Sequence, residues 1–397
     1  MKKKLAELNL KLKGLTIFRE LTATPVILKL QILLDALENK DEDDQVEAYG
    51  AFVSALYPET SNFSLYIKSF LLNNDNFYVK QRAAGSLLSP LVENCLMEEV
   101  AVLQDLSKLT SSDVKSVIRY KGFLPDWENT LFDFKYDYHE RIGNLPHTGY
   151  GIYAKYSTFT LKDGQIIPVK YPDPQSVDQL FGYQRERDLI IKNTQALISG
   201  QGASNMLLYG DAGTGKSSSI KAVANFYAKD GLRLVEVKKN TLYQIPDVID
   251  ELSANPLKFI LFIDDLSFSS NDDNFSALKA ILEGSVSTGG KNIAIYATSN
   301  RRHLVKETMG ERDGNELHLS DTLQETMSLA ARFGLTITYQ RPERDEYLSI
   351  VKHLAVEYGL ALGDDELFRK AEAHAIRHNG RSPRTAKQFV ELQKIGI

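Results

Sequence analysis

The sequence predicts an α/β fold, in which a parallel sheet is flanked by helices, together with a mostly helical N-terminal domain and a small C-terminal helical domain. Between residues 183 and 300, short apolar runs alternate with helical patterns, which is typical of a buried parallel sheet with crossover helices. A glycine-rich turn connects one of these apolar runs to a helix. The residues before about 140 and after about 342 show helical spacing instead.

Composition limits the class of protein. The chain has 397 residues, enough for two or three domains, and its 43% hydrophobic and 25% charged residues exclude a disordered or collagen-like chain. A formal net charge of −5 excludes general basicity as a sign of nucleic-acid binding, so any such contact needs a local basic patch. The single cysteine, Cys95, excludes an internal disulfide framework or a cysteine zinc site and fits a reducing compartment.

Hydropathy argues against a membrane protein. No stretch approaches the roughly 20 apolar residues that cross a bilayer. The N-terminal lysines resemble those of a signal peptide, but Glu7, Asn9 and Lys11 interrupt any apolar segment behind them. We therefore expect an amphipathic first helix and a cytoplasmic protein.

Residues 1–145 are predicted to form a helical N-terminal domain, and they carry no recognisable motif. Apolar residues at helical spacing define one face of the segment 26–37, and these are Ile27, Leu30, Leu33, Leu34 and Leu37. The polar run 39–45 predicts a turn and the start of the next helix. Aromatic residues farther along could form a ligand pocket, but their helical spacing favours core packing.

Residues 146–175 are predicted to hold a β-hairpin and a linker. β-branched and aromatic residues alternate on both sides of Asp163-Gly164, a pair that favours a hairpin turn. Pro172 and Pro174 then oppose regular structure, so the main domain boundary is expected near them.

Residues 176–341 are predicted to form the α/β core, and residues 342–397 a helical bundle. Strands are expected at 205–210, 233–237, 258–264 and 292–299. Helices are expected at 185–200, 216–229, 247–253 and 275–284.

The strongest motif is Gly-Asp-Ala-Gly-Thr-Gly-Lys-Ser at 210–217, which fits G-x-x-x-x-G-K-[ST] between a strand and a helix. The glycines allow backbone N–H groups to surround a polyphosphate at a helix N-terminus. Lys216 is expected to reach the β- and γ-phosphates, and Ser217 to ligate Mg²⁺. The predicted nucleotide-binding residues here are Gly210, Asp211, Ala212, Gly213, Thr214, Gly215, Lys216, Ser217 and Ser218.

A second element is the apolar strand 258–263, which is followed by Asp264 and Asp265. The carboxyl end of such a strand lies at the edge of the sheet where these folds bind ligands. Asp264 is expected to hold Mg²⁺ and Asp265 to orient the attacking water. Alternatively, the two aspartates only cap the next helix.

With these elements identified, residues 176–397 resemble the AAA+ ATPase superfamily. The resemblance implies a sensor 1 residue at Asn300, an arginine finger for the neighbouring subunit at Arg332, and a sensor 2 arginine in a helical lid at Arg384. It also implies that the segment containing Leu180, Phe181 and Gly182 packs around adenine. More narrowly, segments such as 327–334 resemble an uncharacterised bacterial AAA+ family filed as a domain of unknown function, which brings no biological role.

Each of these assignments has a rival. Asn300 could simply start a turn, and Arg384 could form a structural salt bridge. Arg332 could form a surface ion pair, and Arg341 and Arg344 are rival fingers.

The sequence departs from the superfamily pattern at two positions. Asp265 stands where most members carry glutamate, so water positioning could rely on another group such as Glu283, although helicase loaders and replication initiators also tend to carry Asp-Asp. Ala331 precedes the predicted finger where an acidic residue is common.

The resemblance implies an ATPase that binds and hydrolyses ATP with Mg²⁺ at a subunit interface of a homo-oligomer and remodels a macromolecular partner through its N-terminal domain. A translocating unfoldase is disfavoured, because Tyr243 lacks the following glycine of a peptide-gripping loop. The first alternative is a slowly hydrolysing nucleotide switch, similar to a helicase loader, that binds DNA or a DNA-bound protein. The basic run Arg301-Arg302-His303 motivates it, although the sequence favours a solvated surface as the explanation of such charges. A second alternative is a scaffold that keeps ATP as a structural ligand.

Overall fold

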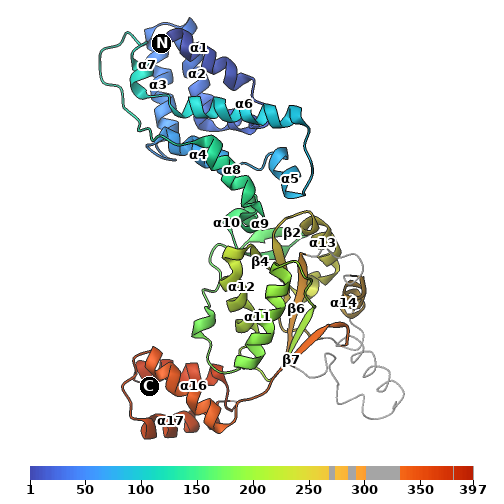
Figure 1. Ribbon diagram of the computed structural model, residues 1–397. Coiled ribbons are helices and arrows are strands. Elements are labelled where there is room, and N and C mark those ends of the chain that lie inside the picture. Colours follow the sequence, from blue (N-terminus) through green and yellow to red (C-terminus); the bar gives the residue numbers. More distant parts are fainter. Residues whose placement is uncertain (268–272, 285–291, 301–330, 379, 397) are drawn as a thin grey trace. The chain divides into compact units, whose positions relative to one another are not determined.

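The chain folds into two compact units, Met1–Ala154 and Lys155–Ile397 (Figure 1). The computed structural model describes residues 1–267, 273–284, 292–300, 331–378 and 380–396. In these ranges, no helix combines the length and the hydrophobicity needed to cross a membrane. The domain limits predicted at residues 145, 175 and 341 remain predictions.

The first unit is helical, as the sequence predicts. Its helices are α1 (Lys2–Lys13), η1 (Arg19–Ala23), α2 (Pro25–Asn39), α3 (Glu42–Leu56), α4 (Phe63–Asn73), α5 (Phe77–Ala83), α6 (Pro90–Ser107), α7 (Ser111–Lys115), α8 (Phe134–Gly143), α9 (Leu145–Thr148) and α10 (Ile152–Lys155). Side-chain caps explain where several of them begin: Asp41 accepts a hydrogen bond from the Asp44 backbone at α3, and Asn62 accepts one from Leu65 at α4.

One apolar core holds this unit together. The predicted face of α2 is fully buried, from Ile27 to Leu37. Trp127, the only tryptophan, packs against Tyr49, Phe52 and Phe63 at ring-centroid distances of 5.7, 5.1 and 6.4 Å. These aromatic residues therefore pack in the core, as expected.

The second unit contains a seven-stranded sheet in the order β2-β1-β4-β5-β6-β3-β7. The strands are β1 (Thr158–Lys162), β2 (Gln165–Pro168), β3 (Met206–Gly210), β4 (Leu232–Val237), β5 (Lys258–Ile263), β6 (Ile293–Ser299) and β7 (Leu335–Tyr339). The predicted hairpin is present, with both turn residues, Asp163 and Gly164, at positive φ. Its strand β1 pairs in parallel with β4 and so extends the sheet. The sequence analysis did not predict β7.

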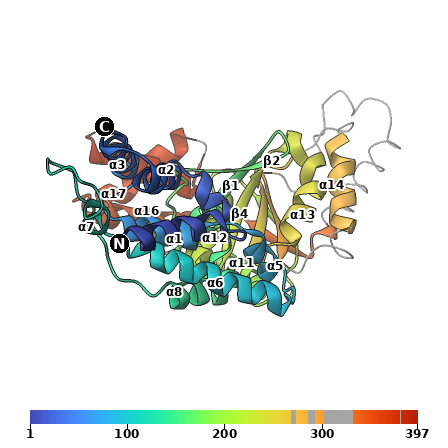
Figure 2. The ribbon, with the colours of Figure 1, turned by 90° about the horizontal axis from the view of Figure 1, so that it is seen from above.

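Helices cover both faces of the sheet. Figures 1 and 2 show α11 (Gln184–Ile198) and α12 (Lys216–Phe226) on one face, and α13 (Ile245–Ser253) and α14 (Asp273–Gly284) on the other. Alternate strand residues, such as Leu208 in β3 and Ile260 in β5, pack with the first pair of helices. Burial on both faces explains why the central strands β3, β5 and β6 are mostly apolar.

Three helices complete the unit: α16 (Arg344–Glu357), α17 (Asp364–Arg377) and α18 (Pro383–Lys394). They share an apolar core around Tyr347, Val351 and Phe389, which are all buried. We call this bundle the lid. The parallel sheet, the crossover helices and the lid confirm the predicted α/β P-loop architecture.

Candidate functional site

The loop between β3 and α12 has the conformation of a phosphate-binding loop. Gly210, Gly213 and Gly215 have φ angles of 142°, 80° and 94°, which other residues rarely adopt. A Cβ atom on Gly210 would lie 1.9 Å from the Tyr339 carbonyl oxygen, so only glycine fits beside β7. Because α12 begins at Lys216, the loop ends at a helix N-terminus, where N–H groups without helical partners favour an anion.

Lys216 lies inside this loop and is 5% exposed. Its ammonium group donates to the carbonyl oxygens of Gly210 at 3.0 Å and Asp211 at 2.7 Å, and to Asn300 Oδ1 at 2.9 Å. Burial lowers the pKa of this ammonium group from its ordinary value. The three acceptors oppose that effect, and they hold the cation at the centre of the loop.

Ser217 and Asp264 meet at the carboxyl edge of the sheet. The Ser217 hydroxyl donates to Asp264 Oδ1 at 2.6 Å, and the Thr298 hydroxyl donates to the same oxygen at 2.5 Å. Mg²⁺ prefers oxygen ligands and is usually bound by one or two carboxylates together with water and substrate phosphates. A hydroxyl and a carboxylate within hydrogen-bonding distance of each other, beside a phosphate-binding loop, fit such an ion.

Asp265 is held by Thr298 on β6 and by Asn300 just after that strand. Its backbone N–H donates to Thr298 Oγ1 at 3.0 Å, and its carboxylate accepts a hydrogen bond from Asn300 Nδ2 at 2.7 Å. Its φ is 52°, a left-handed conformation that aspartate tolerates better than most residues. Lys216, Asn300 and Asp265 thus form a continuous hydrogen-bonded chain.

These groups open into a cavity of about 680 Å³ between the P-loop and the lid. Polar residues of the lining include Lys216, Asp264 and Asn300. Its apolar and aromatic residues include Leu180, Phe181, Ile350, Leu354 and Tyr358. A lining of this mixed kind suits a ligand that has both charged groups and a flat, less polar part.

The segment before α11 is fixed against the cavity. Asn225 on α12 donates to the backbone carbonyls of Asp173 and Gln175, both at 2.9 Å. The Phe181 ring stacks on His353 of the lid with centroids 4.4 Å apart, and Arg187 donates to the Gly182 carbonyl. The linker is therefore ordered where it passes the cavity.

One family model matches most of the second unit. Residues 154–395 match the model of the family described as "Protein of unknown function (DUF815)". The chain belongs to this family. The description of the family assigns no role.

Two solved structures illustrate the partial likeness to known proteins. The RuvB Holliday junction branch migration motor of Thermotoga maritima is 17% identical, with a TM-score of 0.38, over 56% of this chain and 66% of the RuvB chain. The AAA domain of FIGL-1 in complex with ADP is 15% identical, with a TM-score of 0.39, over 57% of this chain and 74% of that one. This chain thus spans just under two thirds of the RuvB chain that it matches.

The arginines of this DUF815 protein occupy different surroundings. Arg384 lines the cavity, and its backbone N–H donates to the Gly213 carbonyl at 3.2 Å, so the lid touches the P-loop directly. Arg341 forms an ion pair with Asp211 of the P-loop at 3.2 Å. Arg344 lies 3.9 Å from Glu372 within the lid. Arg332 precedes β7 and is not among the described residues that line the cavity.

Several expectations lie outside the described residues or their side chains. Arg301, Arg302 and His303 are outside the described ranges, as is the side chain of Glu283. Sequence reasoning also missed some cavity residues. Thr298 could have been found, because it is the penultimate residue of the strand that ends just before Asn300, at the edge of the sheet where the predicted site lies. Lys387 could have been found in the same way, because it lies one helical turn after the predicted Arg384 on α18 and so on the same face of that helix.

Proposed function

We propose that this protein binds ATP with Mg²⁺ in the cavity between the P-loop and the lid and hydrolyses it. The observation that carries the proposal is the meeting of Lys216, the Ser217–Asp264 pair and the Asn300–Asp265 pair in the lining of the cavity. Together they supply the cation, the oxygen ligands and the water-orienting groups that phosphoryl transfer needs. Aromatic side chains of the same lining, such as Phe181 and Tyr358, offer flat surfaces to a base.

Each residue has a role in this proposal. The P-loop backbone and Lys216 bind the phosphates. On binding, phosphate oxygens replace the backbone carbonyls and Asn300 as the hydrogen-bond acceptors of the Lys216 ammonium group. Ser217 and Asp264 hold Mg²⁺, which neutralises charge on the phosphate oxygens. Asp265 and Asn300 orient the attacking water. Arg384 supports the γ-phosphate from the lid.

The test compares Lys216→Ala with the matched control Lys192→Ala, which removes an exposed lysine from α11. We expect Lys216→Ala to lose ATP hydrolysis by at least about a hundredfold, because the charge that stabilises the transferred phosphate is gone. Lys192→Ala should keep normal turnover. A colorimetric phosphate assay measures both. Normal turnover in Lys216→Ala would refute the proposed site.

A second candidate function is a slow nucleotide switch, and the Asp265–Asn300 contact at 2.7 Å favours it. Aspartate is one methylene shorter than glutamate, and its bond to Asn300 occupies an oxygen that water would otherwise use. The switch predicts tight ATP binding with slow turnover that changes when DNA is added. Fast turnover that is independent of DNA would exclude it and leave the remodelling ATPase, whose partner is unidentified.

A further inference from the structure

A long segment connects α7 and α8 in the N-terminal unit (Figure 1). It carries a run of exposed aromatic and basic residues. Five successive residues, Arg119-Tyr120-Lys121-Gly122-Phe123, are all exposed. The Phe123 side chain is 86% exposed and Tyr120 is 41% exposed. Large aromatic side chains in water are costly, because apolar surface left exposed forgoes the free energy of burial. We call these five residues the RYKGF loop.

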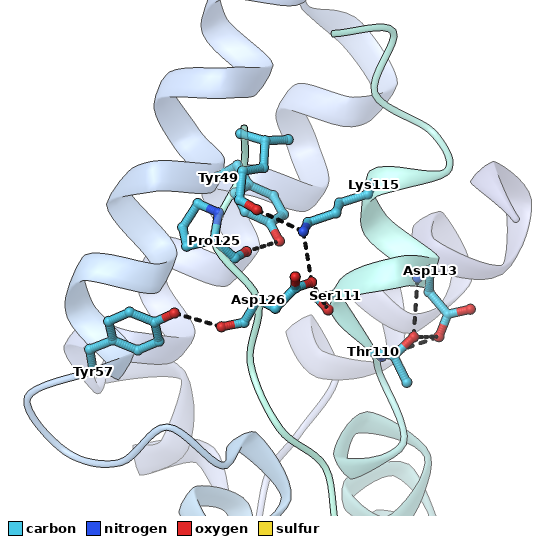
Figure 3. Close-up of polar contacts among 9 residues, drawn as sticks. Tyr49, Tyr57, Thr110, Ser111, Asp113, Lys115, Pro125 and Asp126 are labelled. Carbon is cyan, nitrogen blue, oxygen red and sulfur yellow. Dashed lines mark hydrogen bonds and ion pairs between the residues drawn. The ribbon is translucent and has the colours of Figure 1, made fainter. Parts of the chain in front are cut away.

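The RYKGF loop projects from a fixed base. On either side of it, Ile118 and Leu124 are 2% and 8% exposed, so both ends are packed into the core. The Lys115 ammonium group donates to the Leu124 carbonyl and to Asp126 Oδ1, both at 2.7 Å (Figure 3). The loop is therefore anchored on both sides rather than part of a fraying end.

Two tyrosines strengthen this base, Tyr49 in α3 and Tyr57 directly after it. The Tyr49 hydroxyl donates to the Pro125 carbonyl at 2.7 Å, and the Tyr57 hydroxyl donates to the Asp126 carbonyl at 2.6 Å (Figure 3). Ser111 adds a hydrogen bond of 2.6 Å to the Asp126 carboxylate. A surface held this firmly loses little conformational entropy when a partner binds.

The two cations of the loop have no partner in the described part of the chain: neither Arg119 nor Lys121 forms a hydrogen bond or ion pair there. The sequence from Lys115 to Pro125 contains no acidic residue. The nearby carboxylates are already engaged, Asp126 by Lys115 and Asp113 by Thr110. The loop therefore presents uncompensated positive charge to solvent.

The tyrosine ring is seated on the glycine of the same loop. A Cβ atom on Gly122 would lie 2.0 Å from the Tyr120 hydroxyl oxygen and 2.1 Å from the adjacent ring carbon. Only glycine allows the ring to lie there. The loop thus combines one seated ring, one freely exposed ring and two unpaired cations within five residues.

We propose that the RYKGF loop binds single-stranded nucleic acid. Surfaces that bind single strands without sequence preference combine aromatic side chains, on which bases stack, with cations that contact the phosphates. Here Tyr120 and Phe123 supply the rings, and Arg119 and Lys121 supply the charges. An acidic peptide would form ion pairs with the two cations. It would not explain why two aromatic rings beside them are exposed. The proposal is independent of the ATPase proposal.

Binding of a fluorescein-labelled 20-nucleotide oligothymidylate to the full-length protein tests this, by anisotropy over a range of salt concentrations. Arg119→Gln/Lys121→Gln should weaken binding and reduce the salt slope of log K by about 1.4, since each phosphate contact on a single strand contributes about 0.7. Tyr120→Ala/Phe123→Ala should weaken binding at least about tenfold per ring and leave the slope unchanged. Gly122→Ala, which keeps every charge and ring, should weaken it less.

Matched controls come from the same unit. Lys29→Gln/Lys80→Gln removes two exposed lysines that have no described partner, and Phe77→Ala/Tyr136→Ala removes two exposed rings. Both should bind like the wild type, with Trp127 fluorescence showing that the unit stays folded. Absence of oligothymidylate binding at low salt would overturn the proposal. The proposal would also be overturned if the loop variants lost no more affinity than the control variants, or if the protein bound polyglutamate more tightly than oligothymidylate.

Discussion

At the residue scale, Thr298 connects the two carboxylates of the site. It is 2% exposed, its hydroxyl donates to Asp264, and the same oxygen accepts the backbone N–H of Asp265. A single hydroxyl thus contacts both Asp264, the proposed metal ligand, and Asp265, the proposed water-orienting residue. Thr298 is therefore a positioning residue in the proposed reaction, since it acts through two other groups.

Replacing Thr298 tests this role. Thr298→Val removes the hydroxyl with little change in shape, so we expect kcat for ATP to fall about 10- to 100-fold and the Mg²⁺ concentration for half-maximal activity to rise. Nucleotide binding without Mg²⁺ should stay unchanged, because the P-loop is intact. Thr298→Ser keeps the hydroxyl and should restore most of the activity. If valine and serine behave alike, the hydroxyl has no positioning role.

The sequence predicts those parts of the site whose residues lie close together along the chain. The P-loop lies within eight successive residues, and Asp264 ends an apolar strand, so local patterns find both. The Thr298 contact depends on the register between β5 and β6, in which Ile263 pairs with Ala297. The Arg341–Asp211 pair joins residues far apart in sequence. Such contacts are set by packing, which a local pattern does not encode.

At the element scale, Glu99 of α6 joins that helix to the segment between α1 and η1. It is 6% exposed, and its carboxylate accepts hydrogen bonds from the backbone of Thr16, Ile17 and Phe18 and from the Thr16 hydroxyl. Burial alone would raise the pKa of this carboxyl, but the hydrogen bonds outweigh it and the pKa lies below its ordinary value. The ionised form therefore stabilises the folded state.

The sign of the pH dependence follows. Because the folded-state pKa is depressed, the stabilisation is fully present above the unfolded-state pKa and is lost as the pH falls through the folded-state pKa. At pH 7, Glu99→Gln should lower the free energy of unfolding by about 1–3 kcal/mol, because an amide presents one acceptor and an unwanted donor to these N–H groups. The exposed neighbour Glu98→Gln is the matched control and should change little.

Urea unfolding followed by Trp127 fluorescence measures this effect. The only tryptophan lies in the core of the first unit, so its signal reports that unit. The difference between wild type and Glu99→Gln should shrink at acid pH. A constant difference from pH 7 into the acid range would show that packing, and not the charge, stabilises the fold here.

Elements also differ in how well their patterns predict them. Most helices begin at polar caps or show apolar faces, and the strands 206–210, 232–237, 258–263 and 293–299 are strongly apolar, so these were predictable. Strand β7, at Leu335–Tyr339, is short and mixes Leu and Ile with two threonines, which gives a weaker pattern. Its place beside β3 comes from the sheet and not from its own residues.

At the scale of the whole molecule, the ATPase proposal includes a further cation, Arg332, that a second copy of the chain supplies to the site. Arg341 is paired with the P-loop of its own chain, and Arg381 forms a bidentate pair with Glu372 in the lid. Arg332 lies just before β7 and is not among the described residues that line the cavity of its own chain. We propose it as the finger that acts on a neighbouring protomer.

Mixing two inactive variants tests this assembly. Lys216→Ala destroys the P-loop but keeps Arg332, whereas Arg332→Ala keeps the P-loop and lacks the finger. If the finger acts between protomers, each variant alone should be at least about a hundredfold slower than wild type. An equimolar mixture should regain activity, because some interfaces then pair an intact P-loop with an intact Arg332. A finger acting within one chain predicts no gain on mixing, and specific activity independent of protein concentration would argue against a shared site altogether.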